Sequence, residues 1–180
     1  MADIAPDRLV FLAESGVLTN LVRLYARSPR GQRAHGTAPC GDWTRLTILG
    51  ALGLEGILGA MSLEDATSGA VFHAFLDQVL LPQLRRAKPD AVLVMDNRRA
   101  HKAKPVRDLL DRSGFADHYL PAYSPDFNPI EPGWAKMKSG LRKLAARTAE
   151  TLHAALGPAL RAITPEDAQG FFRHAGYLTV

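Results

Sequence analysis

The sequence has one cysteine, Cys40, in 180 residues. An internal disulfide and a zinc site built from several cysteines are therefore excluded, and a reducing cytoplasm is the expected compartment. No apolar run approaches the ~20 residues that a membrane-spanning helix needs, so no membrane partner is expected. The sequence also lacks a glycine-rich phosphate loop, a GxSxG motif and an HExxH motif. These absences argue against nucleotide hydrolases, esterases and zinc proteases.

The composition is that of an ordinary folded protein, with 47% apolar and 22% charged residues. The length suits one domain with a full core and is too short for two large domains. The net charge is only +4, but residues 96–147 carry eleven Lys/Arg against six Asp/Glu, a local net charge of +5. Such a segment favours a polyanionic partner such as nucleic acid, with a solvated basic face as the alternative.

The first third of the chain has short apolar segments separated by turn residues, a pattern that predicts strands. We expect strands at residues 8–14, 20–26, 44–54 and 57–61, with Ser15-Gly16 ending the first and Gly53 to Gly56 forming a turn. Because these strands follow one another closely, an antiparallel meander is predicted.

The rest of the chain alternates between strand and helix patterns. We expect helices at residues 68–85 and 104–113, strands at 91–95 and 115–120, and a helix from about Pro132 with the apolar stripe Trp134, Met137, Leu141 and Leu144. Thr148 and Thr164 are expected to cap two further helices. The fold class predicted is one α/β domain.

Two carboxylates stand out by position. Asp96 ends the apolar strand Val92–Met95, and ligands bind at the carboxyl ends of strands in open α/β sheets. Glu131 begins a helix after a proline-rich loop. Either acid has a structural alternative, because aspartate caps turns and glutamate stabilises first helical turns. Together they suit hard divalent cations such as Mg²⁺, and a pair of such ions supports phosphodiester chemistry.

Several nearby residues are auxiliary candidates. His101 is a candidate contact for a phosphate or a metal-bound water, or a structural histidine, whereas Asn97 and Asn128 are expected to bond backbone in their turns. Tyr123 and Trp134 are expected to pack rather than to stack on bases. The candidate nucleic-acid-binding cations are Arg98, Arg99, Lys102, Lys104, Lys136 and Lys138.

Two motifs carry a family resemblance. VLVMDN-x3-H at Val92–His101 and YLPAYSPDFNPIE-x2-W at Tyr119–Trp134 closely resemble the DDE transposases of bacterial insertion sequences in the mariner-like superfamily. The 34 residues between Asp96 and Glu131 are a spacing typical of that superfamily. RLVFL-x-ESG, RLYARSPRGQR and FFRHAGY also look like family features, so the resemblance covers nearly the whole chain.

The resemblance implies a ribonuclease-H-like fold and metal-dependent DNA cleavage and strand transfer at element ends. It makes Asp96 the second and Glu131 the third catalytic carboxylate, with two Mg²⁺ or Mn²⁺ ions in an intact site. It also implies DNA partners, namely the terminal inverted repeats and a target, and self-association. Full-length relatives carry a helix-turn-helix region first. We therefore expect one catalytic domain over residues 1–180, with a separate helix-turn-helix polypeptide as a possible partner.

The first carboxylate is where this sequence departs from the family. The family pattern places aspartate just before Glu-Ser-Gly on the first strand, and here that position is Ala13. Glu14 is adjacent, but neighbouring residues on a strand point to opposite faces. We therefore expect impaired catalysis, from natural decay or engineered inactivation. The alternative is a non-catalytic DNA-binding or assembly protein, or a transposase remnant.

Overall fold

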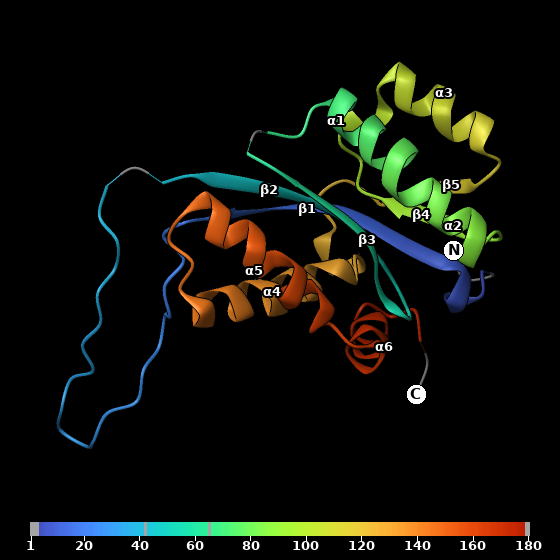
Figure 1. Ribbon diagram of the computed structural model, residues 1–180. Helices are drawn as coiled ribbons and strands as arrows, with labels where there is room; N and C mark the ends of the chain where they lie inside the picture. The colour runs from blue at the N-terminus through green and yellow to red at the C-terminus, as the bar shows by residue number, and fades with distance from the viewer. Residues whose placement is uncertain (1–3, 42, 65, 179–180) are drawn as a thin grey trace.

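Strand β1 (Leu9–Leu18) is the middle strand of a five-stranded sheet with the order β3-β2-β1-β4-β5 (Figure 1). The computed structural model describes residues 4–41, 43–64 and 66–178. The other strands are β2 (Arg45–Gly53), β3 (Gly56–Leu63), β4 (Val92–Met95) and β5 (Ala116–Tyr119). The first three strands are antiparallel, whereas β4 runs parallel to β1 and β5 runs parallel to β4.

Helices cover both faces of the sheet (Figure 1). One face carries α1 (Gly69–Ala74), a π-helical segment (Phe75–Leu80), α2 (Leu81–Ala87) and α3 (Lys104–Ser113). The other face carries α4 (Ile130–Leu144), α5 (Ala149–Arg161) and α6 (Pro165–His174). Short 3-10 turns lie at Pro6–Arg8, Ala100–Lys102 and Pro125–Phe127. This arrangement confirms the predicted α/β class.

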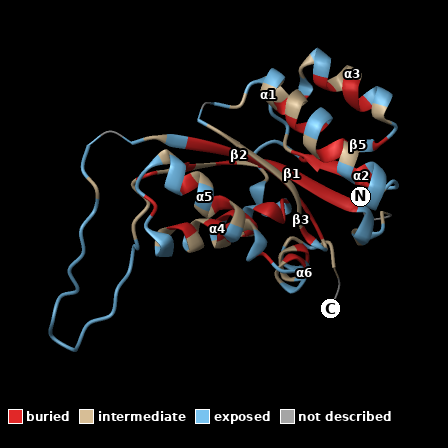
Figure 2. Ribbon diagram, in the orientation of Figure 1, coloured by how far each residue is buried: buried red, intermediate tan, exposed pale blue. Residues whose placement is uncertain are grey.

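Strand β1 is buried over most of its length (Figure 2), and its alternating side chains contribute to two hydrophobic cores on opposite faces of the sheet. Phe11 and Ala13 belong to the core beneath α4, α5 and α6, and the Phe11 ring meets the edge of Phe172 with 5.2 Å between centroids. Val10 and Leu12 belong to the core beneath α1, α2 and α3. Because β1 is buried on both faces, it needs apolar residues at consecutive positions, as its sequence has.

The connection between β1 and β2 differs from the prediction. A strand was expected at residues 20–26, but this segment is extended chain without strand pairing, and Leu24 and Tyr25 are 66% and 90% exposed. The first strand also continues past Ser15-Gly16 to Leu18. Gly16 lies within this strand, where an added Cβ would be 3.0 Å from the Nε of the flexible Arg45 side chain.

Most helix boundaries follow the predicted signals. Helix α3 spans the predicted residues and ends at Gly114, which has a positive φ of 80°. Thr148 and Thr164 form capping boxes at the starts of α5 and α6. Helix α4 begins two residues before Pro132, and Leu144 is 58% exposed rather than part of the apolar stripe. Within the described residues, no helix has the length and apolarity required to cross a bilayer.

Candidate active site

Asp96 and Glu131 line one pocket of about 410 Å³ at the carboxyl end of β4. Asp96 directly follows this strand, and Glu131 lies in the first turn of α4. The proline-rich loop of residues 120–125 forms another wall of the pocket. The structure therefore brings together the two acids that lie 34 residues apart in the sequence.

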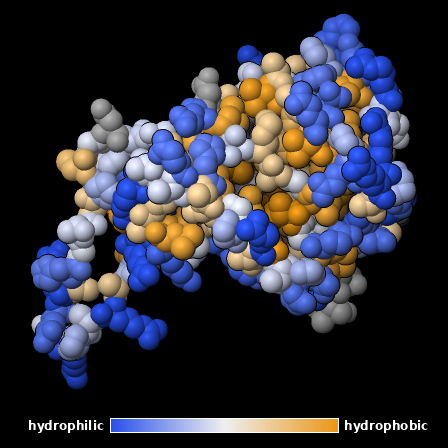
Figure 3. All heavy atoms as spheres, in the orientation of Figure 1, coloured by the Kyte–Doolittle hydropathy of each residue, from blue (hydrophilic) through white to orange (hydrophobic). Residues whose placement is uncertain are grey.

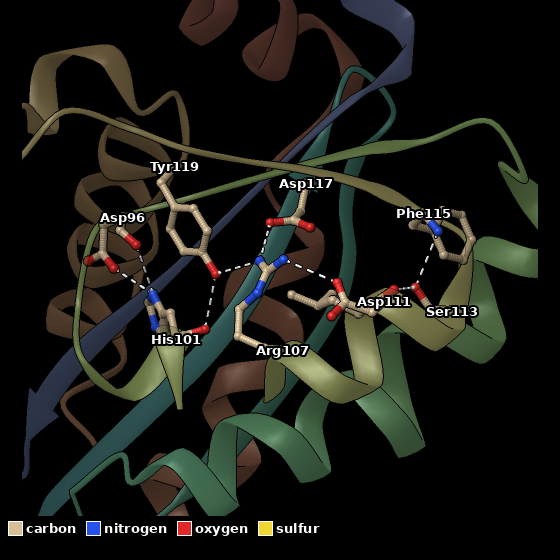
Figure 4. Close-up of polar contacts among 9 residues, drawn as sticks. Asp96, His101, Arg107, Asp111, Ser113, Phe115, Asp117 and Tyr119 are labelled. Atoms are coloured by element: carbon tan, nitrogen blue, oxygen red, sulfur yellow. Dashed lines mark hydrogen bonds and ion pairs between the residues drawn. The ribbon is translucent and has the colours of Figure 1, made fainter. Parts of the chain in front are cut away.

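The Asp96 carboxylate is held from two sides. Its Oδ1 lies 2.6 Å from His101 Nδ1, and its Oδ2 lies 2.9 Å from Arg98 Nε. His101 is fully buried and stacks on Phe72 with 4.0 Å between ring centroids. Its Nδ1 also lies 3.2 Å from the Asp96 carbonyl oxygen (Figure 4). His101 is thus a buried neighbour that orients Asp96.

A chain of polar contacts continues behind His101 (Figure 4). The Tyr119 hydroxyl donates to the His101 carbonyl oxygen at 3.2 Å and accepts from Arg107 Nη1 at 3.1 Å. Arg107 also bonds Asp117 at 2.6 Å. The Tyr119 hydrogen bond and the Asp117 contact raise the pKa of the Arg107 guanidinium. This network fixes the turn after β4 against α3 and β5.

Ala13 occupies the β1 position nearest to Asp96 in register. Leu12 and Met95 form the last parallel pair between β1 and β4, and Ala13 and Asp96 are the next residues on each strand. Ala13 is 4% exposed and lies on the sheet face covered by α4. An alanine here supplies no oxygen ligand to the pocket.

Glu14 does not replace the missing acid. It lines a separate pocket with Ser15 and Thr47 rather than the pocket of Asp96 and Glu131. The two sites are nevertheless linked, because Arg98 forms ion pairs with both Glu14 and Asp96. Sequence reasoning placed Arg98 among DNA-binding cations and missed this bridge, since the separation of more than 80 residues from Glu14 gave no signal.

The electrostatics of Glu131 differ from those of an ordinary surface acid. Although the residue as a whole is exposed, partial desolvation of its carboxyl raises the pKa of Glu131. The positive charges of Lys138 and Arg98 lower this pKa, and the negative charge of Asp96 raises it further. Lys138 lies about two helical turns after Glu131 on α4. Burial lowers the Lys138 pKa, Glu131 raises it, and Arg142 and Arg45 lower it.

Of the four turn and packing residues predicted around the pocket, two behave as expected and two do not. Asn128 is 3% exposed, and its Oδ1 accepts from the Ile130 N–H at 3.4 Å, as expected for a turn residue. Asn97 has no such bond among the described residues and lines the pocket. Tyr123 does not pack: it is fully exposed and has a positive φ of 58°. Trp134, in contrast, is buried as predicted.

The predicted nucleic-acid-binding cations do not gather on one face. Lys102 lies 5.1 Å from the Tyr119 ring centroid, and Lys104 pairs with Asp108 at 2.8 Å on the α3 side of the sheet. Lys136 on α4 pairs with Asp167 on the opposite side. Arg99 is exposed and has no ion pair among the described residues. Most of this set is therefore neutralised within the chain or dispersed.

The residues present fit a divalent cation only in part. Mg²⁺ takes oxygen ligands and is commonly held by one or two carboxylates together with substrate phosphates, which Asp96 and Glu131 can provide. They do not fit a two-ion site, because Ala13 contributes no ligand. Within the described residues, no three His, Cys, Asp or Glu side chains lie close enough to hold a metal ion.

The mixed sheet, with its order and helices on both faces, is that of the ribonuclease-H-like transposase catalytic core. A solved Mos1 pre-cleavage transpososome matches with a TM-score of 0.79 and 21% identity over 96% of this chain and 54% of the other. A Mos1 paired-end complex with the left transposon end matches with a TM-score of 0.78 and 22% identity, over 94% and 52%. The Mos1 catalytic domain matches with a TM-score of 0.72 and 19% identity, over 95% and 78%.

The family model of the DDE superfamily endonuclease matches residues 8–153. The chain therefore belongs to the DDE superfamily of endonucleases, as the sequence motifs predicted. It spans about half the length of the Mos1 chains in the paired-end complex and in the pre-cleavage transpososome. Other Mos1 paired-end complexes contain Mn or Mg. No protein of curated function shows a significant sequence match to this chain.

Proposed function

We propose that this chain is a transposase catalytic domain of the insertion-sequence type, built for metal-dependent DNA cleavage and strand transfer but impaired by Ala13. The observation that carries the proposal is the position of three residues. Asp96 and Glu131 share one pocket, and Ala13 is the residue next to Asp96 on the neighbouring strand. The proposed partners are terminal inverted repeats and target DNA, with self-association and a separate helix-turn-helix polypeptide for end recognition.

The proposed roles follow from the chemistry of the side chains. Asp96 and Glu131 would hold a Mg²⁺ or Mn²⁺ ion together with substrate phosphate, and such an ion would supply stabilisation of the negative charge that develops in phosphodiester chemistry. His101 orients Asp96 from a fully buried position. Partial desolvation raises the pKa of Glu131, and a bound cation would favour its charged form. Of the predicted cations, Arg98 and Lys138 lie nearest the two acids.

A second candidate function has its own supporting observation. Arg98 gives Asp96 and Glu14 a shared positive partner without any metal. A site in which Asp96 is already paired with a guanidinium suits a metal-free protein that binds DNA or assembles with an active transposase.

The test compares the native chain with Ala13→Asp, measuring Mg²⁺ and Mn²⁺ binding by calorimetry and cleavage of element-end DNA. We expect weak metal binding and little cleavage by the native chain, and gains in both for the variant. Robust metal-dependent cutting by the native chain would refute impairment. If Ala13→Asp binds metal but never cleaves, the non-catalytic function is favoured.

A further inference from the structure

The connection between β1 and β2 forms an exposed arm, defined here as residues 19–41, which leaves the sheet beside α4 and extends beyond it (Figure 1). Its surface is mainly hydrophilic (Figure 3). The base of the arm is tied to the end of α4 by a hydrogen bond of 2.7 Å from Arg147 Nη1 to the Leu21 carbonyl oxygen. The arm and α4 thus form the two walls of a defined groove.

This arm groove has a volume of about 830 Å³ and is lined by cations from both walls. Arg23 and Arg27 come from the arm, and Arg142, Lys143 and Arg147 come from the last turn of α4 and the residues after it. No acidic residue appears among the described residues that line it. The arm itself has four arginines and no Asp or Glu. The groove is therefore a concentrated positive site.

The cations of the arm groove differ in their pairing from Lys104 and Lys136, which were also predicted to bind nucleic acid. Among the described residues, Arg23, Arg27, Arg142 and Lys143 form no ion pair, whereas Lys104 and Lys136 are each paired with an aspartate. The Arg142 Nε is buried and has no acceptor among the described residues. A buried donor without an acceptor is costly, and a ligand oxygen would supply the missing acceptor.

The positive potential of the groove extends toward the candidate active site. Arg142 and Arg45 both act to lower the pKa of Lys138, in addition to the larger effect of burial. Lys138 in turn interacts with Glu131 of the active-site pocket. Cations on α4 therefore follow one another from the acidic pocket toward the arm groove.

We propose that the arm groove binds the phosphate backbone of nucleic acid, holding a DNA strand that extends away from the pocket of Asp96 and Glu131. Guanidinium groups match phosphate oxygens in geometry, and several unpaired arginines on two walls suit consecutive phosphates rather than a single anion. Binding here carries no sequence information, because phosphate contacts position DNA without reading bases. This inference rests on the proposed action on DNA.

A second copy of the chain is the competing occupant, since Leu24 and Tyr25 are exposed on the arm. Charge argues against it. The chain has a net charge of +4, and bringing another copy to a wall of five cations adds like charges. A polyanion instead gains from every cation in the groove through counterion release.

The test measures binding of the full chain to a short labelled duplex of random sequence, by fluorescence anisotropy, between about 50 and 200 mM salt. The variant is Arg23→Gln combined with Arg142→Gln. Losing two phosphate contacts should make the negative slope of log affinity against log salt shallower by about 1.8. The loss of affinity between the lowest and the highest salt concentration then becomes roughly tenfold smaller. The matched control is Lys104→Gln combined with Lys136→Gln, which removes the same charge from paired sites.

An unchanged slope in the control and a reduced slope in the groove variant support the proposal. Equal losses in both variants, a loss only in the control, or no DNA binding by the native chain would overturn it. Sedimentation of each variant without DNA tests whether a second copy of the chain occupies the groove. If the groove variant changes self-association but leaves the salt slope unchanged, the proposal is contradicted. None of these readouts requires catalysis, so failure of Ala13→Asp to cleave leaves the result interpretable.

Discussion

Ala13 on β1 and Asp96 just after β4 are the first residues beyond the last parallel pair of the two strands, Leu12 and Met95, and so are neighbours at the edge of the candidate active site. Ala13 also pairs with Gly50 on its other side, where the Trp134 ring covers the sheet. An acid at position 13 would thus lie between Asp96 and an apolar core. Because a buried carboxylate at position 13 would need a cation to balance its charge, the stability of Ala13→Asp should depend on bound metal.

We expect Ala13→Asp to lower the free energy of unfolding by roughly 3 kcal/mol in metal-free buffer, because it buries an unpaired carboxylate near Asp96. Mg²⁺ at about a hundredfold excess over its Kd should restore about 2.7 kcal/mol. Thermal denaturation with and without Mg²⁺ measures both effects. Ala13→Asn is the control, which should be destabilised without being rescued. Equal Mg²⁺ stabilisation of the native chain and Ala13→Asp would contradict the prediction.

The Arg98 bridge should compete with a metal for Asp96. In the Ala13→Asp background, Arg98→Gln should tighten Mg²⁺ binding by about threefold, the effect of removing a partly exposed ion pair. Arg99→Gln removes the same charge from the next residue, which has no ion pair among the described residues, and should change the affinity less. Isothermal calorimetry compares the two. Weaker binding after Arg98→Gln would show that the guanidinium supports the site instead.

Gly50 is required by the close approach of Trp134. A Cβ at position 50 would lie 2.5 Å from Trp134 Cη2, and Trp134 is only 2% exposed, so the ring has little room to move. We expect Gly50→Ala to destabilise the fold by about 2 kcal/mol through overpacking. Gly36→Ala, where nothing lies within 4 Å of the added Cβ, should have little effect in the same urea titration. Equal effects of the two changes would disprove the packing argument.

Ala145 ends α4 in the left-handed conformation, with φ of 52°. This conformation costs a residue with a side chain roughly 1–2 kcal/mol, and glycine avoids that cost. Glycine also loses more chain entropy on folding, which offsets part of the gain. Ala145→Gly should therefore raise the free energy of unfolding by about 0.5 to 1 kcal/mol. Ala162 ends α5 with φ of −72°, so Ala162→Gly should not stabilise the protein. Stabilisation by both changes would argue against conformational relief at Ala145.

Asp167 should make part of the stability dependent on pH. Its bond with Lys136 and the 2.9 Å hydrogen bond from the Thr164 N–H lower the pKa of this carboxyl below its ordinary 3.8. The folded state thus favours the charged form, so this stabilisation is present above 3.8 and is lost as pH falls through the lowered pKa. Asp167→Asn should cost about 0.5 to 1 kcal/mol at neutral pH and little near about pH 2.

Urea denaturation of Asp167→Asn at these two pH values checks the sign. Asp77→Asn, a change of an exposed acid without an ion pair among the described residues, is the matched control. An equal loss from Asp167→Asn at both pH values would show that the Asp167 charge is irrelevant to folding.

The regular elements with strong local signals could be predicted from the sequence. Helix α3 has Pro105 in its first turn and Gly114 after it, and β4 is continuously apolar. The segment at residues 20–26 failed because Leu24 and Tyr25 satisfy a strand pattern without any neighbouring strand to pair with. Tyr123 failed for the opposite reason: the loop holds its backbone in a positive φ and turns the ring toward solvent.

The sequence by itself determined the family and the α/β class, and it singled out the two candidate acids, because these depend on motifs and on periodicity along the chain. Only the tertiary structure decided how the charges pair. Lys136 finds Asp167, and Arg98 joins Glu14 to Asp96, across separations that no local pattern reveals. The same folding leaves Arg23 beside Arg142 without an acid, since unpaired charge is a property of neighbours in space rather than in sequence.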